Sequence, residues 1–215
     1  YWYDNNGSES FTRTLVATGI RGGRMVKAAD MDNDGDIDVV TVSDTDDDVA
    51  WHENNGSQSF TEHIISSGAL DYAYSVDIVD LDQDGDMDIL TGSYSGNGGT
   101  VWYKNNGSQS FTGITISSTG VTGIEGADLD KDGDIDIVVG DGSTNIYWFK
   151  NDGSENFTSN SVSSNTENEH IKIIDIDRDG NLDILSGSTN RGGYVKWHKQ
   201  SYDAVVPTVS SVSSS

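Results

Sequence analysis

The sequence predicts an all-β fold, specifically a β-propeller built from four-stranded antiparallel blades. A tryptophan recurs with spacings of 49, 51, 46 and 49 residues, at Trp2, Trp51, Trp102, Trp148 and Trp197. A phenylalanine follows each of the first four tryptophans by nine residues, and an acidic segment recurs at a similar interval. The apolar runs are short, lack helical periodicity and are bounded by Gly, Asn, Asp and Ser, which is typical of strands. A regular repeat of this length with four strands is typical of propeller blades. A sandwich or a stack of hairpins is the alternative, but a sandwich does not need repeated sequence.

Each repeat is expected to contain four strands, here named A to D in chain order. Strand A precedes the acidic segment and strand B follows it. Strand C carries the tryptophan and strand D carries the phenylalanine. Strands C and D are joined by the near-copies DNNGSESF, ENNGSQSF, KNNGSQSF and KNDGSENF. Asn, Asp and Gly tolerate the positive φ angles of tight hairpin turns, so each of these segments is predicted to be such a turn.

The order of strands bears on how many blades the complete ring has. The chain begins with strands C and D, continues with three full sets, and is expected to end with strands A, B and C. After Trp197 the turn motif is replaced by HKQSYDAVVP, so the last blade is predicted to lack its own strand D. The strand at Phe11 could fill that gap and close a four-bladed ring. We favour a larger ring of seven or eight blades, because it also accounts for the surplus strand at Trp2. The propeller repeats then span residues 1–200, and residues 201–215 are a linker or the start of a following domain.

Composition excludes several classes of partner. The 215 residues contain 36 acidic and 12 basic side chains, a net charge of -24, and no cysteine. Nucleic-acid binding and adsorption to anionic membranes both need clustered Lys and Arg, so neither is expected. No apolar run reaches the roughly 18 residues that a membrane span requires, so no membrane insertion is expected. Five Trp, nine Tyr and five Phe argue against intrinsic disorder.

Four acidic segments follow the pattern D-x-D-x-D-G-x-x-D, at residues 30–38, 80–88, 128–136 and 175–183. Calcium prefers six to eight oxygen ligands, and alternate aspartates on a curled loop supply them while glycine permits the turn. Carboxylates crowded in this way would repel one another without a cation. The sequence therefore predicts about four Ca²⁺ ions, with Mg²⁺ and Zn²⁺ disfavoured by geometry and ligand type. The segments are not EF-hands, because position 12 holds Thr41, Thr91, Val139 or Ser186 in place of glutamate.

An acidic loop between two blade strands, repeated about every 48 residues, resembles the FG-GAP / VCBS repeat family of calcium-binding β-propellers. The Phe-Gly and Gly-Ala-Pro signatures of that family are not intact here, so the bacterial VCBS-type subset is the closer likeness. The resemblance covers residues 1 to about 200 and implies an extracellular or cell-surface protein. It also implies these metal ligands: Asp30, Asp32, Asp34, Asp36 and Asp38; Asp80, Asp82, Asp84, Asp86 and Asp88; Asp128, Asp130, Asp132, Asp134 and Asp136; and Asp175, Asp177, Asp179, Asn181 and Asp183.

Strand topology separates the metal loops from the variable connections. The A–B loops and C–D turns lie at one end of a blade, and the D–A and B–C connections lie at the other. Binding sites usually lie in variable loops on a rigid scaffold, so we expect a structural role for calcium and a ligand at the opposite end. Tyr72, Tyr74, Tyr94 and Tyr194 are expected in those connections. They would either stack on sugar rings or pack between blades.

The expected function is an extracellular calcium-binding module for adhesion or ligand binding. Its partners would be an extracellular protein or a glycan, together with further domains of the same polypeptide. The alternatives are the propeller domain of a polysaccharide lyase or hydrolase, and a structural spacer. We do not expect an enzyme, because the four histidines show no Ser-His-Asp order and the clustered carboxylates are assigned to metal.

Overall fold

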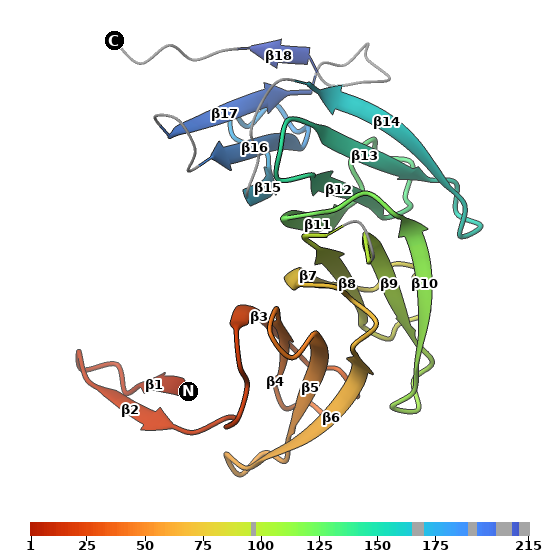
Figure 1. Cartoon of the computed structure of the whole chain (residues 1–215). Coiled ribbons are helices and arrows are strands. Elements are labelled where there is room, and N and C mark those ends of the chain that lie inside the picture. Colours follow the sequence, from red (N-terminus) through yellow and green to blue (C-terminus); the bar gives the residue numbers. More distant parts are fainter. Residues whose placement is uncertain (96–97, 165–169, 189–192, 201–207, 211–215) are drawn as a thin grey trace.

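The computed structural model describes residues 1–95, 98–164, 170–188, 193–200 and 208–210. This part of the chain consists of 18 strands and the turns between them, arranged in five antiparallel sheets. It contains no helix, and therefore none that could cross a membrane. Figure 1 shows the sheets following one another along an open arc. The fold is thus all-β, as the sequence predicts.

The strands form one hairpin and four sheets of four strands each. The hairpin contains β1 (Trp2–Asn5) and β2 (Phe11–Thr14). Sheet I contains β3 (Gly23–Ala29), β4 (Asp38–Ser43), β5 (Asp48–Asn54) and β6 (Phe60–Ser67). Sheet II contains β7 (Ala73–Val79), β8 (Asp88–Ser93), β9 (Thr100–Asn105) and β10 (Phe111–Ser117). Sheet III contains β11 (Gly123–Ala127), β12 (Asp136–Gly140), β13 (Ile146–Asn151) and β14 (Phe157–Ser163). Sheet IV contains β15 (His170–Ile174), β16 (Asp183–Ser188), β17 (Tyr194–Lys199) and β18 (Thr208–Ser210).

Each four-stranded sheet has the form of a propeller blade. Its strands pair in chain order as A, B, C and D, and every neighbouring pair is antiparallel. The A strands of successive sheets lie against one another, β3 beside β7, β7 beside β11, and β11 beside β15. The sheets do not close into a ring, and β2 pairs with β1. The alternative in which the Phe11 strand completes the last blade is therefore not formed.

The prediction that the last blade lacks its own strand D is wrong. Strand β18 pairs antiparallel with β17, with Trp197 opposite Ser210 and Lys199 opposite Thr208. An edge strand is held by backbone hydrogen bonds, so it needs neither the Asn-Asn-Gly turn nor the phenylalanine that mark the other D strands. The rest of the predicted linker, residues 201–207 and 211–215, lies outside the described residues.

The hydrophobic core consists of three layers, one between each pair of neighbouring sheets. The strand-C tryptophans are central to it, with Trp51, Trp102 and Trp148 only 1 to 2% exposed. The ring of Trp51 meets Phe111 of sheet II edge-on at 6.3 Å, and Trp102 meets Phe157 of sheet III at 6.4 Å. At Trp51, Trp102 and Trp148 the tryptophan repeat therefore forms core between neighbouring blades. Truncating one of these rings to alanine typically costs about 3–5 kcal/mol.

The C–D turns have the structure that their Asn and Gly residues predict. In the first turn, the side-chain oxygens of Asn5 and Asn6 accept hydrogen bonds from the backbone N–H groups of Gly7 and Ser8, at 2.9 and 2.8 Å. Such short-range bonds favour a turn over a continued strand. Gly7 has a φ of 74°, which glycine adopts without strain. The same bonds recur in the next three turns and fix the start of each D strand.

Candidate metal centre

Each acidic loop curls around the carboxylate of its first aspartate. In loop 1 (residues 30–38), Asp30 accepts backbone N–H bonds from Asp34 at 3.2 Å and from Gly35 at 3.0 Å. The first aspartates of loop 2 (residues 80–88) and loop 4 (residues 175–183) accept both bonds, and that of loop 3 (residues 128–136) accepts the bond from its glycine. Gly35 has a φ of 94°, outside the range that other residues tolerate, so the loop closes there. The curl brings the side chains of the first and third loop residues together in all four loops.

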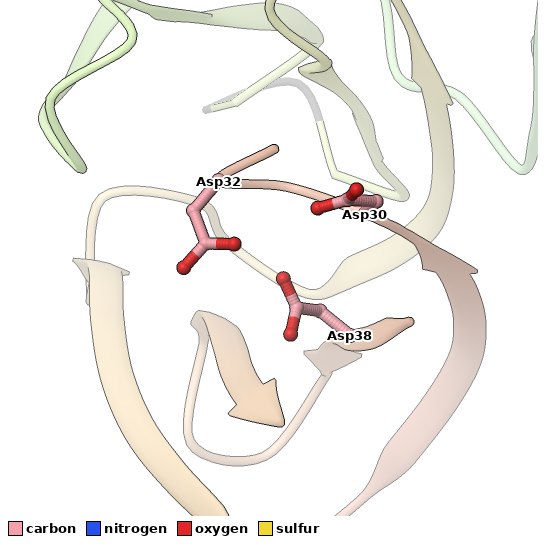
Figure 2. Close-up of side chains that lie close together, drawn as sticks. All are labelled: Asp30, Asp32 and Asp38. Atoms are coloured by element: carbon pink, nitrogen blue, oxygen red, sulfur yellow. The ribbon is translucent and has the colours of Figure 1, made fainter. Parts of the chain in front are cut away.

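The loops gather three carboxylates each, with ligand oxygens within 4.8 Å of one another. Loop positions are counted from 1 at the first aspartate to 9 at the last. The carboxylates of positions 1, 3 and 9 lie together in loops 1, 2 and 4, and those of positions 1, 3 and 5 lie together in loop 3. The members are Asp30, Asp32 and Asp38; Asp80, Asp82 and Asp88; Asp128, Asp130 and Asp132; and Asp175, Asp177 and Asp183. Figure 2 shows the side chains of Asp30, Asp32 and Asp38 facing a common space. Burial and the charges of Asp34 and Asp38 raise the pKa of Asp32.

Carboxylate oxygens without hydrogen-bond partners in loops 2 and 3 are consistent with sites that could hold a divalent cation. Among the described residues, Asp82, Asp128 and Asp130 each have a buried carboxylate oxygen, Oδ1, that lacks a hydrogen-bond donor. The side chain of Asp82 is only 10% exposed. A buried carboxylate oxygen without a partner is costly, and a bound cation would satisfy it. The all-oxygen donor set suits a hard ion such as Ca²⁺.

The aspartate at position 9 has a second role, because it fastens the acidic loop to strand C. In sheet III, Asp136 is fully buried and accepts N–H bonds from Leu129 at 3.2 Å and from Asn151 at 2.9 Å. Equivalent pairs of bonds end on Asp38, Asp88 and Asp183. Burial raises the pKa of Asp88 and of Asp136 to about 6, although the backbone N–H donors oppose this rise.

The residue at position 7 lies outside the carboxylate clusters. The side chain of Asp36 lies against Gly56 of the neighbouring C–D turn, and Asp86 and Asp134 lie likewise against Gly107 and Gly153. These contacts place the A–B loop and the C–D turn at the same end of each blade, as the strand topology predicts. The side chain at position 7 therefore supports the C–D turn.

Sequence reasoning missed three lysines that lie at the clusters. Lys104 forms an ion pair with Asp82, Lys150 lies 3.0 Å from Asp132, and Lys199 lies 3.1 Å from Asp179. Each comes from strand C, two residues after its tryptophan. Strand alternation places such a residue on the same face as the tryptophan, and this signal could have identified all three.

All four predicted tyrosines lie at the opposite end of the blades, but only three of them lie together. Tyr72 and Tyr94 are joined by a backbone hydrogen bond of 3.0 Å, and the rings of Tyr74 and Tyr94 are 5.9 Å apart. Tyr74 lies within β7, and Tyr194 is the first residue of β17, so neither lies in a connection as expected. Tyr194 is in another sheet, with the ammonium of Lys196 at 4.6 Å from its ring centre. The structure therefore brings Tyr72, Tyr74 and Tyr94 together and leaves Tyr194 apart.

Among solved structures, the chain is similar to a lectin from Agrocybe aegerita whose structure is described as recognising non-reducing terminal N-acetylglucosamine. The TM-score is 0.53 at 19% sequence identity, over 81% of this chain and 52% of the lectin. The chain thus spans about half the length of that relative, and the likeness concerns the fold. A search of curated proteins gives no significant match.

A family model for the FG-GAP-like repeat matches residues 30–91 and 128–186. Each match begins at the first aspartate of an acidic loop and ends in strand B of the next sheet. Together the matches cover more than half of the chain and include all four loops. The resemblance that the sequence motifs indicate is confirmed, and the chain belongs to the FG-GAP-like repeat family.

Proposed function

We propose that this protein is an extracellular calcium-stabilised propeller module that binds a ligand and has no catalytic activity. The observation that carries the proposal is the repetition of one carboxylate cluster in four successive blades, with ligand oxygens within 4.8 Å in each. Calcium in these loops would neutralise the clustered charge and satisfy the buried oxygens. Extracellular calcium is concentrated enough to fill sites of modest affinity. The ion would then stabilise the native state by mass action.

A thermal melt with and without chelator tests the calcium proposal. Removing calcium should lower the Tm, because a site filled at a hundred times its Kd contributes about 2.7 kcal/mol. Adding calcium back should restore the Tm. The D80N variant should respond less to calcium, whereas D4N, which changes an exposed acid in β1, should respond like the wild type. An unchanged Tm in chelator, with no metal bound, would contradict the proposal.

We also propose that the four sheets belong to a larger ring of seven or eight blades. Trp2 is 37% exposed, whereas its equivalents Trp51, Trp102 and Trp148 are buried between sheets. Tyr1, Tyr3 and Phe11 are each more than half exposed on the same hairpin. The hairpin corresponds to strands C and D, and strands A and B of the same blade would pair beside β1, as strand B pairs with strand C in the other sheets. The open arc in Figure 1 leaves room for such blades.

The ligand that we propose is a glycan, bound at the tyrosine cleft. This cleft has a volume of about 290 Å³ and is lined by Arg24, Asp44, Tyr72, Tyr74, Tyr94, Thr122 and Gly142. Tyr72 and Tyr94 are 52% and 59% exposed, so their ring faces are available to stack on a sugar. Arg24 forms an ion pair with Asp44 and lies over Tyr74 at 5.0 Å, which fixes polar groups beside the rings. The fold likeness to a lectin supports this ligand class.

A glycan array that includes N-acetylglucosamine-terminated chains tests this site. Y94A should weaken binding, while Y3A, an equally exposed tyrosine on the β1–β2 hairpin, should not. Binding without turnover supports the proposal. Product formation from a polysaccharide would instead support the lyase or hydrolase alternative. If no glycan is bound and no polysaccharide is cleaved, glycan binding is contradicted. A protein ligand or a spacer role would then be left.

A further inference from the structure

The charge that strand C places beside the acidic loop is not the same in all four sheets. The strand-C position two residues after the tryptophan is lysine in sheets II, III and IV, at Lys104, Lys150 and Lys199, but it is Glu53 in sheet I. Strand register shows that these residues are equivalent. Glu53 lies opposite Thr61, Lys104 opposite Thr112, and Lys150 opposite Thr158, each one residue after the phenylalanine of strand D.

The three lysines act as cations supplied by the protein itself. Lys150 forms ion pairs with both Asp130 and Asp132, and Lys199 forms them with both Asp177 and Asp179. These aspartates occupy positions 3 and 5 of their loops. Lys104 pairs with Asp82 and, at 2.6 Å, with Glu155 of the next sheet.

Aromatic contacts hold two of these lysines in place. The ammonium of Lys104 is 5.4 Å from the ring centre of Trp102, and that of Lys199 is 5.7 Å from that of Trp197. Each is thus held between a tryptophan face and an acidic loop. A favourable cation–π contact of this kind limits where the ammonium can move. The lysine charge is therefore a fixed part of the loop's surroundings.

Loop 1 has a different neighbour. The carboxylate of Glu53 accepts a hydrogen bond from His63 Nε2 at 2.7 Å, and the imidazole stacks on Trp51 with ring centres 4.6 Å apart. His63 thus stacks on Trp51, whereas in sheets II and IV a lysine ammonium lies over the equivalent ring. Within the described part of the chain, no lysine or arginine forms an ion pair with an aspartate of loop 1.

We propose that this strand-C residue sets the calcium affinity of each loop, so that loop 1 is the tight site and loops 2, 3 and 4 are weaker. The inference rests on the proposed binding of calcium to the loops. In loop 1, the negative charge of Glu53 acts on the cluster, because burial and nearby charges, that of Glu53 included, raise the pKa of Asp32. In the other loops, calcium must enter beside a lysine ammonium or displace it from the carboxylates. Buried oxygens remain without donors at Asp82 and Asp130, so lysine lowers the affinity without replacing the ion.

Isothermal titration calorimetry of the metal-free chain with calcium tests the ranking. The wild type should show one tight site and three weaker ones, separated by roughly tenfold or more in Kd, because like charges a few ångströms apart repel strongly. E53K should convert the tight site into a weak one. K104M should create a second tight site, because methionine keeps the apolar stem over Trp102 without the charge.

Folding is checked by the far-UV circular dichroism of each variant, and E53Q serves as a second variant if E53K does not fold. E53Q should weaken the tight site by a smaller factor than E53K. Four equal affinities that K104M and E53Q leave unchanged would overturn the ranking while leaving calcium binding intact. If calcium gave no binding heat and did not shift the Tm, the proposed function itself would fail.

Discussion

The side-chain amide of Asn33 in loop 1 donates a hydrogen bond of 2.8 Å to the carboxylate of Asp86 in loop 2. The same connection recurs along the chain. Gln83 of loop 2 donates to the backbone carbonyl of Gly133 in loop 3, and Lys131 of loop 3 lies 2.9 Å from the side-chain oxygen of Asn181 in loop 4. The residue at position 4 of each loop therefore reaches to position 6 or 7 of the next. These bonds connect the blades at the metal end, outside the hydrophobic core.

Substitution of Asn33 should weaken the contact between sheets I and II. Asn33 has a φ of 62°, which asparagine tolerates better than alanine. N33A should therefore lose both the hydrogen bond and the favourable conformation, about 1–3 kcal/mol in the free energy of unfolding. N33G should lose only the bond, about 0.5–1.5 kcal/mol. Urea denaturation measures both, and two variants as stable as the wild type would show that the bond contributes nothing.

Asp136 should stabilise the fold whether or not metal is present. D136N keeps the shape of the side chain but sets an amide NH₂ against the backbone N–H of Leu129 or Asn151. The unsatisfied donor should cost about 1–3 kcal/mol. The loss should persist in chelator, and D4N should cause none. If stability is lost only in the presence of calcium, Asp136 acts as a metal ligand and its hydrogen bonds between loop and strand do not stabilise the fold.

Two glycines at the same place in different C–D turns separate backbone strain from crowding. Gly7 and Gly107 have nearly equal φ angles of 74° and 69°, but a Cβ on Gly7 meets open space, whereas one on Gly107 meets the carboxylate of Asp86. G7A should cost about 1–2 kcal/mol through its φ angle alone, and G107A should cost more. In a D86A background the excess for G107A should vanish. Equal costs for G107A in both backgrounds would rule out the contact.

Buried His198 should make the fold sensitive to acid. Burial lowers the pKa of His198 to about 4, and its Nε2 lies 3.0 Å from the hydroxyl of Ser186. An unfolded histidine takes up its proton near pH 6.5, so between about pH 6.5 and 4 the unfolded state binds more protons than the folded state. Stability should therefore fall as the pH falls through this window.

The equivalent positions of sheet III suggest a variant that tests the acid sensitivity of the fold. There the equivalent positions hold Phe149 and Val139, and both are buried. The double variant H198F/S186V should fold with a shallower loss of stability between about pH 6.5 and 4, measured by denaturant titration at several pH values. A slope equal to that of the wild type would assign the acid sensitivity to other groups.

Repetition explains why much of the fold could be predicted from the sequence. The spacing of Trp51, Trp102 and Trp148 reflects a contact that every blade must make with the next. The same physical requirement therefore produces the same residue in each repeat. The acidic loops can also be predicted from the sequence, because their curl depends on hydrogen bonds within nine consecutive residues. Local chemistry repeated in this way can be read without knowing how the sheets are placed.

The features that were missed depend on contacts between distant segments. Strand alternation gives the face on which Lys150 and Lys199 lie, but not their partners, which are about 20 positions away, and the bond from Asn33 to Asp86 spans 53 positions. Strand β18 lacks the phenylalanine of the other D strands, so its pairing with β17 carries no such mark in the sequence. The wrong expectation for Tyr194 has the same origin, because a strand boundary is set by pairing partners and not by the residue itself.

The forward reach of the position-4 side chain has a consequence for how such a chain can change in length. Each repeat carries a donor for the loop ahead and an acceptor for the loop behind, as loop 2 does with Gln83 and Asp86. A duplicated or deleted copy therefore brings or removes both halves of the connection at once, and the flanking copies meet compatible partners. Gene duplication in whole-repeat steps could enlarge or shrink the array without any new contact having to arise by mutation.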